Sequence, residues 1–122
     1  MEFEFKKNNS LQKRIEQYEK IEKEYPDKVP IIIEKAKNCK ITKDIKTKYI
    51  LGKSLTMAEL IKIIRGKLEI EPETALFFLA NGKHTISSAE VLGTVYEMHK
   101  DKQDGFLYIS YSEEMVYGYK AL

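Results

Sequence analysis

The fold of this chain is decided by the stretch FLYISY, residues 106–111. Apolar or aromatic side chains occur on both faces of this stretch, which is typical of a strand that is covered on both sides. We therefore expect it to lie in the middle of a sheet. The strand ends at Ser112, and a polar tail that begins with Glu113 and Glu114 leads to Gly118, after which only YKAL, residues 119–122, remains.

Two helices upstream are predicted from their first residues. Thr56 and Glu59 form a capping box at the start of a helix over residues 56–67, because each side chain can accept from a free backbone amide at the helix end. Ser87 and Glu90 repeat the same pattern and predict a second capping box. The helix after the second box is expected to run through His99.

The remaining pattern gives one helix and three more strands. We expect an irregular or helical arm at 1–9, a helix at 11–25 capped by Ser10, strands at 29–33, 48–51 and 75–80, and a basic polar loop at 37–47. The order is helix, strand, strand, helix, strand, helix, strand. The middle helix is expected to cross one face of a four-stranded sheet.

Composition limits the class of protein. A chain of 122 residues is long enough for one domain, and a net charge of +2 does not by itself indicate nucleic-acid binding. Residues 1–50 carry 13 Lys and Arg against 9 Asp and Glu, which fits either a basic side of the fold or scattered solvated lysines. Cys39 is the only cysteine, which excludes an internal disulfide and fits a reducing compartment.

The chain has no pattern typical of an enzyme. His84, His99 and Cys39 have no spacing that indicates a nucleophile–base pair or a metal site, and no glycine-rich phosphate loop is present. We therefore predict that the protein is not an enzyme and holds no metal. The sequence has neither a signal-peptide pattern nor a run long enough to span a membrane, so we expect a cytoplasmic location.

Several stretches together resemble one known family. They are KI at 20–21, YPDKVPIIIEKA at 25–36, KYIL at 48–51, ALFF at 75–78, FLYI at 106–109 and VYG at 116–118. They closely resemble the ubiquitin-like modifiers of autophagy, the family of the GABA-receptor-associated protein and the microtubule-associated protein light chains. The resemblance covers residues 1–118.

The resemblance implies a fold and a domain organisation. It implies an α+β, ubiquitin-like β-grasp fold, with a four-stranded mixed sheet and an N-terminal helical extension. Residues 1–25 would form the extension and residues 26–118 the ubiquitin-like domain with its tail. Residues 119–122 would be a peptide that is removed by processing.

The resemblance also implies a conjugation pathway. In this family a cysteine protease cleaves after the glycine that matches Gly118, which here is the bond before Tyr119. Activating and conjugating enzymes then link the new carboxylate to phosphatidylethanolamine on the autophagosome membrane. A glycine suits this chemistry because it is the least hindered residue to activate. The covalent lipid is the only added group that we expect.

By the same resemblance, the strand at 48–51 would dock short peptides of cargo receptors and assembly factors by strand addition. The expected pocket for an aromatic side chain is lined by Gln17, Ile21, Pro30, Ile32, Lys48, Ile50 and Phe106. The expected pocket for an aliphatic side chain is lined by Tyr49, Leu51, Leu55, Leu60, Ile63 and Ile64. The expected contacts for acidic residues flanking the peptide are Lys28, Lys46, Lys48, Arg65 and Lys67.

Several alternatives stay open. Ile32, Leu60 and Ile64 also satisfy the strand and helix patterns, so an ordinary core position is an equal interpretation for each. Gln17, where the family often has an acid, and Leu60, where it often has phenylalanine, leave the choice of partner undetermined. The first alternative function is an unconjugated adaptor on vesicles or microtubules. A weaker one is a basic surface for anionic membranes or nucleic acid, although we expect no nucleic-acid partner.

Overall fold

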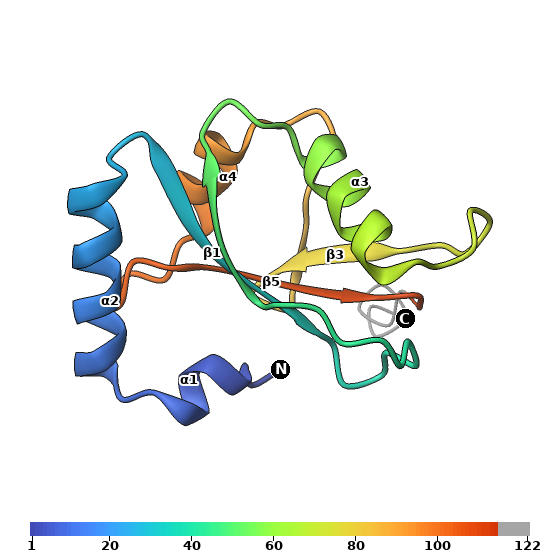
Figure 1. Cartoon of the computed structure of the whole chain (residues 1–122), viewed down its shortest axis with the longest axis horizontal. Coiled ribbons are helices and arrows are strands. Elements are labelled where there is room, and N and C mark those ends of the chain that lie inside the picture. Colours follow the sequence, from blue (N-terminus) through green and yellow to red (C-terminus); the bar gives the residue numbers. More distant parts are fainter. Residues whose placement is uncertain (115–122) are drawn as a thin grey trace.

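The described part of the chain forms one sheet with helices on both faces (Figure 1). The computed structural model describes residues 1–114, so Gly118 and the YKAL end lie outside the described residues. Its helices are α1 (Glu4–Asn8), α2 (Leu11–Glu24), α3 (Met57–Leu68) and α4 (Leu92–His99). Its strands are β1 (Lys28–Lys35), β2 (Lys48–Gly52), β3 (Phe77–Ala80), β4 (His84–Thr85) and β5 (Leu107–Ser112).

The strand β5 lies at the centre of the sheet, as the sequence predicts. The strand order is β2-β1-β5-β3-β4, with β5 parallel to β1 and antiparallel to β3. All six residues of β5 are buried. The sheet is therefore mixed. Because β5 lies at its centre and is covered on both faces, neither face of this strand is polar.

Alternate residues of β1 and β5 point to two separate apolar clusters. Ile31 and Ile33 belong to the larger cluster, which α3 and α4 cover. Ile32 belongs to a second cluster with Phe106 and Tyr108, to which the N-terminal segment adds Phe3 and Ile21. Because the side-chain period of a strand is two, one strand can supply both cores.

One of the two predicted capping boxes is confirmed. Thr56 Oγ1 accepts from Glu59 N, and Thr56 N donates to the Glu59 carboxylate at 3.0 Å. The second box is wrong: α4 begins only at Leu92, and Val91 at its N-cap position makes no side-chain cap bond within residues 1–114.

The segment 87–90 forms a turn for a physical reason. Its carbonyls are used by the first amides of α3, since Met57 N donates to Glu90 O and Ala58 N donates to Ser88 O. The side chain of Ser87 instead accepts from Ala89 N two residues on. The turn therefore caps α3 rather than opening a helix of its own.

The predicted fold class is confirmed, with one strand more than expected. Within residues 1–114 the sheet has five strands, because β4 adds two residues that pair with Leu79 and Ala80. The turn at Asn81-Gly82 that precedes β4 has positive φ at both residues, as this dipeptide predicts. No helix among the described residues is both long and apolar enough to cross a membrane.

Candidate functional site

The strand β2 forms an open edge of the sheet. It pairs with β1 on one side, and among the described residues no strand pairs with its other side. Opposed residues in an antiparallel pair alternate between those that exchange backbone hydrogen bonds and those that do not. Ile33 N donates to Thr47 O at 2.8 Å, and the register then leaves Lys48 and Ile50 with their amides and carbonyls directed outward. These groups are free to bond an added strand.

The two predicted pockets lie on opposite sides of β2. Ile50 packs on the cluster beneath α2, and the Lys48 ammonium donates to the Gln17 side chain of α2 at 2.9 Å. Tyr49 and Leu51 pack on the opposite cluster, against α3. This division follows from the alternation of side chains along a strand.

Most residues of the predicted aromatic pocket are buried, and three of them reach the surface. Ile21, Ile32 and Phe106 are buried in one cluster, and Pro30 is buried opposite Ile50 in the register. Of the seven predicted residues, Ile50 and Gln17 are half-buried and Lys48 is exposed. The structure thus brings all seven to one end of the sheet, and these three are the ones that reach the surface.

The predicted aliphatic pocket divides in the same way. Leu60 and Ile64 are fully buried, so they occupy ordinary core positions in this structure. Leu51 and Leu55 are half-buried, and Ile63 on α3 is 38% exposed. Leu51 and Leu55 both pack against the larger cluster and remain partly accessible, and Ile63 adds an exposed apolar side chain on α3.

Tyr49, the remaining residue of this predicted pocket, has an unusual setting. It is 4% exposed, and its hydroxyl has no hydrogen-bond partner among the residues that the structure describes. Burial raises the pKa of this hydroxyl. The ammonium groups of Lys46 and Lys67 lie 5.1 and 6.0 Å from its ring centroid, so the ring helps to hold two of the predicted cationic side chains at the edge.

Lys28 and Arg65, the other predicted cationic residues, differ in how available their charged groups are to a docked peptide. Lys28 is exposed, with its ammonium 5.6 Å from the ring centroid of Tyr25. The guanidinium of Arg65 is already engaged, because it donates to the carbonyls of Glu71 and Pro72 at 3.2 and 3.0 Å. Arg65 therefore braces the turn after α3 and is less available to a peptide than the lysines are.

Comparison with known proteins decides the family. A family model described as the autophagy protein Atg8 ubiquitin-like family matches residues 13–118 of this chain. This chain belongs to the Atg8 ubiquitin-like family. The crystal structure of ATG8 from Trypanosoma brucei is similar to it, with 29% identity and a TM-score of 0.83 over 92% of this chain and 95% of that one. The resemblance that the sequence indicated is therefore confirmed.

Membership fixes the general role of the chain. Proteins of the Atg8 family are ubiquitin-like modifiers and adaptors in autophagy rather than enzymes, and they act with conjugation enzymes and cargo receptors. Among the described residues of this Atg8-family chain, no group of three or more His, Cys, Asp or Glu side chains could hold a metal ion. Gly118, the predicted conjugation residue, lies outside the described residues.

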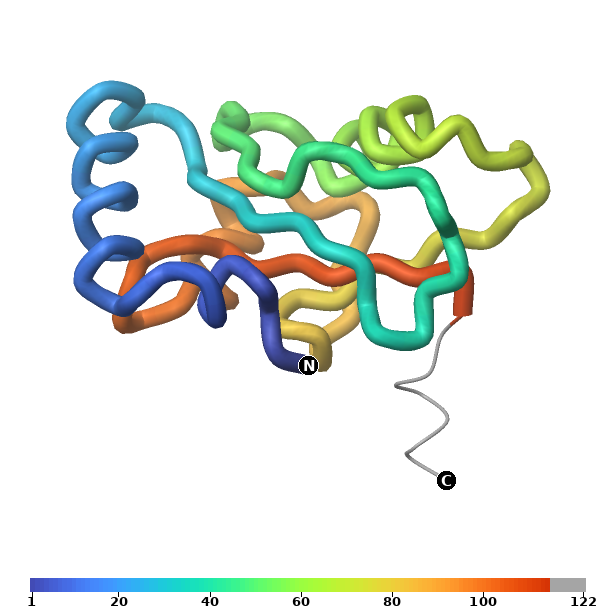
Figure 2. Tube along the Cα trace, turned by 60° about the horizontal axis from the view of Figure 1, so that its bottom comes forward, coloured from blue at the N-terminus to red at the C-terminus, as the bar shows by residue number. Residues whose placement is uncertain are grey.

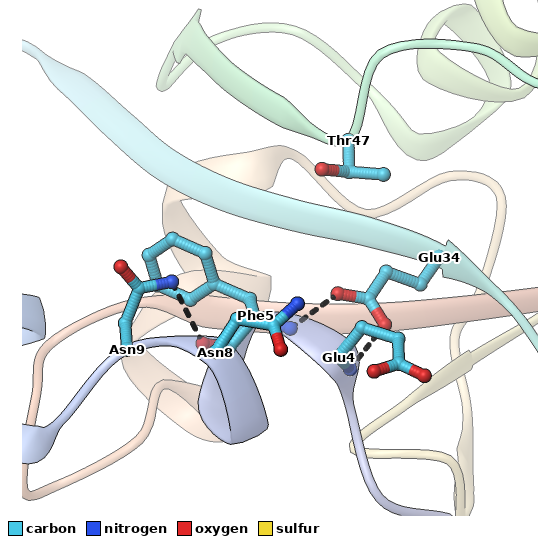
Figure 3. Close-up of a pocket in the computed structure, with 6 residues that line it drawn as sticks. All are labelled: Glu4, Phe5, Asn8, Asn9, Glu34 and Thr47. Atoms are coloured by element: carbon cyan, nitrogen blue, oxygen red, sulfur yellow. Dashed lines mark hydrogen bonds between the residues drawn. The ribbon is translucent and has the colours of Figure 1, made fainter.

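Sequence reasoning missed a set of residues next to the edge of this Atg8-family fold. A pocket of about 310 Å³ is lined by Glu4, Phe5, Asn8, Asn9, Glu34 and Thr47 (Figure 3). Gln17, which holds Lys48, donates in turn to Asn9 Oδ1 at 3.4 Å, and Asn9 donates to Phe5 O at 3.0 Å. No periodicity could have indicated Asn9, because its position depends on how the link between α1 and α2 folds back.

The buried carboxylate of Glu34 anchors α1 beside this pocket. Its two oxygens accept from Glu4 N and Phe5 N at 2.8 and 3.0 Å, as Figure 3 shows. The two amides at the start of this short helix are thereby satisfied by a side chain of β1. The N-terminal arm consequently has a fixed place on the sheet.

Proposed function

We propose that this chain is a ubiquitin-like modifier that is conjugated through Gly118 to phosphatidylethanolamine and acts in autophagosome formation. The observation that carries the proposal is the extent of the family match, which ends at Gly118 and leaves YKAL beyond it. A cysteine protease would remove residues 119–122, and activating and conjugating enzymes would transfer the carboxylate of Gly118 to the lipid. The same molecule would then be cytoplasmic before conjugation and on the autophagosome membrane after it.

The physical logic of the proposal is that the lipid supplies the anchor. On this proposal the lipid attaches the domain to the membrane, and no helix among residues 1–114 is long and apolar enough to cross a membrane. A phospholipid brings two acyl chains, and two such anchoring groups are enough for stable membrane attachment. Conjugation therefore switches the domain between two locations without a change in its fold.

Mass spectrometry of the C-terminal peptide from membrane and soluble fractions of starved cells tests the conjugation. We expect a peptide that ends at Gly118 and carries a phosphatidylethanolamine adduct in the membrane fraction. A Gly118→Ala variant is the matched control, and we expect it to remain without the adduct. An intact YKAL end on every molecule would contradict the proposal and favour the unconjugated adaptor.

We further propose that the open edge of β2 docks short peptides of cargo receptors and assembly factors. The outward amides and carbonyls of Lys48 and Ile50 support this, because an added strand needs such partners. An apolar surface lies on each side of the edge. One is formed at Ile50, and the other at Leu51 and Leu55. Ile63 is a further exposed apolar side chain, on α3.

The geometry of the edge sets the spacing in the peptide. Successive side chains of an added strand point to opposite faces, and the two apolar surfaces lie on opposite faces. The aromatic and aliphatic residues must therefore be an odd number of positions apart, such as i and i+3. Exposed Lys46 and Lys48 favour acidic residues next to them.

Calorimetric titration with three peptides of equal composition tests this proposal. The aromatic and aliphatic residues are placed at i and i+2, i+3 or i+4, and we expect the i+3 peptide to bind at least about tenfold more tightly than the others. Leu51→Ala combined with Ile63→Ala should weaken that binding about tenfold or more, because both side chains are accessible and apolar. Met98→Ala, at an exposed methionine of α4, is the control. Equal affinity for all three peptides would contradict the proposed docking.

A further inference from the structure

A row of side-chain hydrogen bonds runs from the N-terminal arm to the edge strand β2. Asn9 Nδ2 donates to Phe5 O at 3.0 Å, which Figure 3 shows, and Gln17 Nε2 donates to Asn9 Oδ1 at 3.4 Å. Lys48 Nζ in turn donates to Gln17 Oε1 at 2.9 Å. We call the two middle residues, Asn9 and Gln17, the amide relay.

The groups at the two ends of the relay allow its amides only one orientation. The carbonyl of Phe5 can only accept a hydrogen bond, and the ammonium of Lys48 can only donate. Asn9 must therefore turn its NH2 group toward Phe5 and its oxygen toward Gln17. Gln17 must then turn its own oxygen toward Lys48, because a reversed amide would place two donors or two acceptors against each other.

The relay begins at a fixed point on the sheet. Asn9 lies in the link between α1 and α2, where the chain turns a corner (Figures 1 and 2). Phe5 N donates to the buried carboxylate of Glu34 in β1 at 3.0 Å, so the residue whose carbonyl starts the relay is itself bonded to the sheet. The side chain of Lys48 is thereby held in place through the N-terminal arm.

The relay holds Lys48 without neutralising its charge. Gln17 is uncharged, and none of the ion pairs found among residues 1–114 includes Lys48. An ammonium has three donors, so two remain for a ligand when one is bonded to Gln17. Because Lys48 is already held in the free protein, less of its rotamer entropy remains to be lost when a ligand binds.

We propose that Asn9 and Gln17 are positioning residues that make the β2 edge select peptides with an acidic side chain before the aromatic residue. This inference rests on the proposed docking of peptides at β2. Lys48 and Ile50 share one face of β2 and lie two positions apart, and Leu51 follows them on the other face. With the aromatic residue at i and the aliphatic residue at i+3, the acidic residue is therefore expected at i−2.

Calorimetric titration of the full chain with two matched peptides tests this inference. Both carry the aromatic and aliphatic residues at i and i+3, and they differ only in having Glu or Gln at i−2. At low ionic strength the wild type should bind the Glu peptide about fivefold more tightly, the most that an exposed ion pair usually contributes. Gln17→Glu should lower this ratio of affinities to about one, because the new carboxylate pairs with Lys48. Gln12→Glu adds the same charge at an exposed position of α2, and as the matched control it should keep the ratio near fivefold.

A double-mutant cycle shows whether Asn9 acts through Gln17. Asn9→Ala and Gln17→Met each break the relay, so each should lower the ratio to about twofold. The ratio is the readout because a merely structural loss would weaken both peptides equally. The variant with both changes should have the ratio of either single variant, since both interrupt one row of bonds. Reductions that multiply would overturn the inference, because each residue would then act separately.

The docking proposal and this inference fail in different ways. If neither peptide binds the wild type, the docking proposal is wrong and the inference fails as well. If both peptides bind equally, or if Gln17→Glu and Gln12→Glu have the same ratio, docking stands and the inference is overturned. The relay is also observable without a peptide by NMR. Asn9→Ala and Lys48→Met should each shift the side-chain NH2 signals of Gln17, and unchanged signals in both variants would overturn the relay.

Discussion

At the scale of single residues, Gly105 has the least room for a side chain among the described glycines. Its φ is +84°, and a Cβ placed there would lie 2.6 Å from Cδ1 of Tyr18. Gly105→Ala should therefore destabilise the fold by about 1–3 kcal/mol, through backbone strain and displacement of Tyr18 from the turn before β5. Urea unfolding measures this change.

Gly66→Ala is the matched control for that substitution. Gly66 lies in α3, and apart from its two chain neighbours and the nearby backbone of the helix itself no described atom is within 4 Å of the Cβ position. Alanine there should stabilise the helix by about 0.5–1 kcal/mol. A Gly105→Ala protein as stable as the wild type would show that the contact with Tyr18 does not constrain this turn.

Buried tyrosines make the fold sensitive to alkali. Burial raises the pKa of Tyr111 to about 12 in the folded chain, against an ordinary value near 10 in the unfolded chain. Folding then favours the protonated form, so this contribution is complete below pH 10 and is lost as the pH rises toward 12. At pH 11 the loss from this one group is about 1.4 kcal/mol.

Urea unfolding at pH 8 and pH 11 tests this linkage with Tyr111→Phe. The variant should lose about 1.4 kcal/mol less than the wild type over this interval, because phenylalanine has no proton to release. Tyr96 and Tyr108, whose pKa values burial also raises, remain in both proteins as an internal reference. An equal loss of unfolding free energy between pH 8 and pH 11 in the two proteins would contradict the role of Tyr111.

At the scale of elements, one buried ion pair holds α2 on the sheet. Arg14 Nε donates to Asp104 Oδ2 at 2.9 Å, and its guanidinium also donates to the carbonyls of Lys6 and Asn9. Asp104 accepts as well from Tyr108 at 2.5 Å. Arg14→Ala leaves this carboxylate buried without its cation, which should cost about 3–5 kcal/mol.

Hydrogen exchange shows which helices lose stability in Arg14→Ala. Amides of α1 and α2 should exchange faster in Arg14→Ala than in the wild type. The exchange rates of α3 amides should change least, because α3 packs on the larger apolar cluster on the other face of the sheet. Lys13→Ala, at the exposed neighbouring position, is the control. If exchange rates in Arg14→Ala change by the same factor in all helices, the ion pair does not anchor α2 selectively.

The two capping-box patterns show how far sequence reasoning reaches for an element. Thr56 and Glu59 form their box because the two residues are near in sequence and their side chains bond each other's backbone amides. Ser87 and Glu90 match the same capping-box pattern, but the carbonyls of residues 88 and 90 are bonded to the first amides of α3. Local patterns predict local hydrogen bonds, and they fail where a distant segment binds backbone carbonyls that the predicted helix would need for its own bonds.

At the scale of the whole molecule, the N-terminal extension is part of the core. Phe3 and Ile21 share a buried cluster with Ile32, Phe106 and Tyr108. Removal of residues 1–24 should expose this apolar face of the sheet, so the remainder should bind a hydrophobic dye, self-associate and lose its cooperative unfolding transition. Removal of residues 119–122 is the control, and a monomeric, cooperatively folded product of the larger truncation would contradict this prediction.

The candidate site was predictable only in part from the sequence. The pattern of β2 predicted an edge with side chains on two faces, and Ile50 and Leu51 do pack on opposite apolar clusters. The pattern could not distinguish Leu60, which is buried, from Ile63, which is 38% exposed, because both are apolar and lie on one helix. That distinction depends on how α3 rotates against the sheet.

The free edge of β2 also has a consequence for the protein at high concentration. Hydrogen-bonding groups that accept a peptide accept the same strand of another copy equally well, and this is the usual route to edge-to-edge aggregation. The strand is only five residues long, and Lys46 and Lys48 place positive charge where two such edges would meet. These lysines therefore serve as gatekeepers against self-association, which matters most when many copies are confined to one surface.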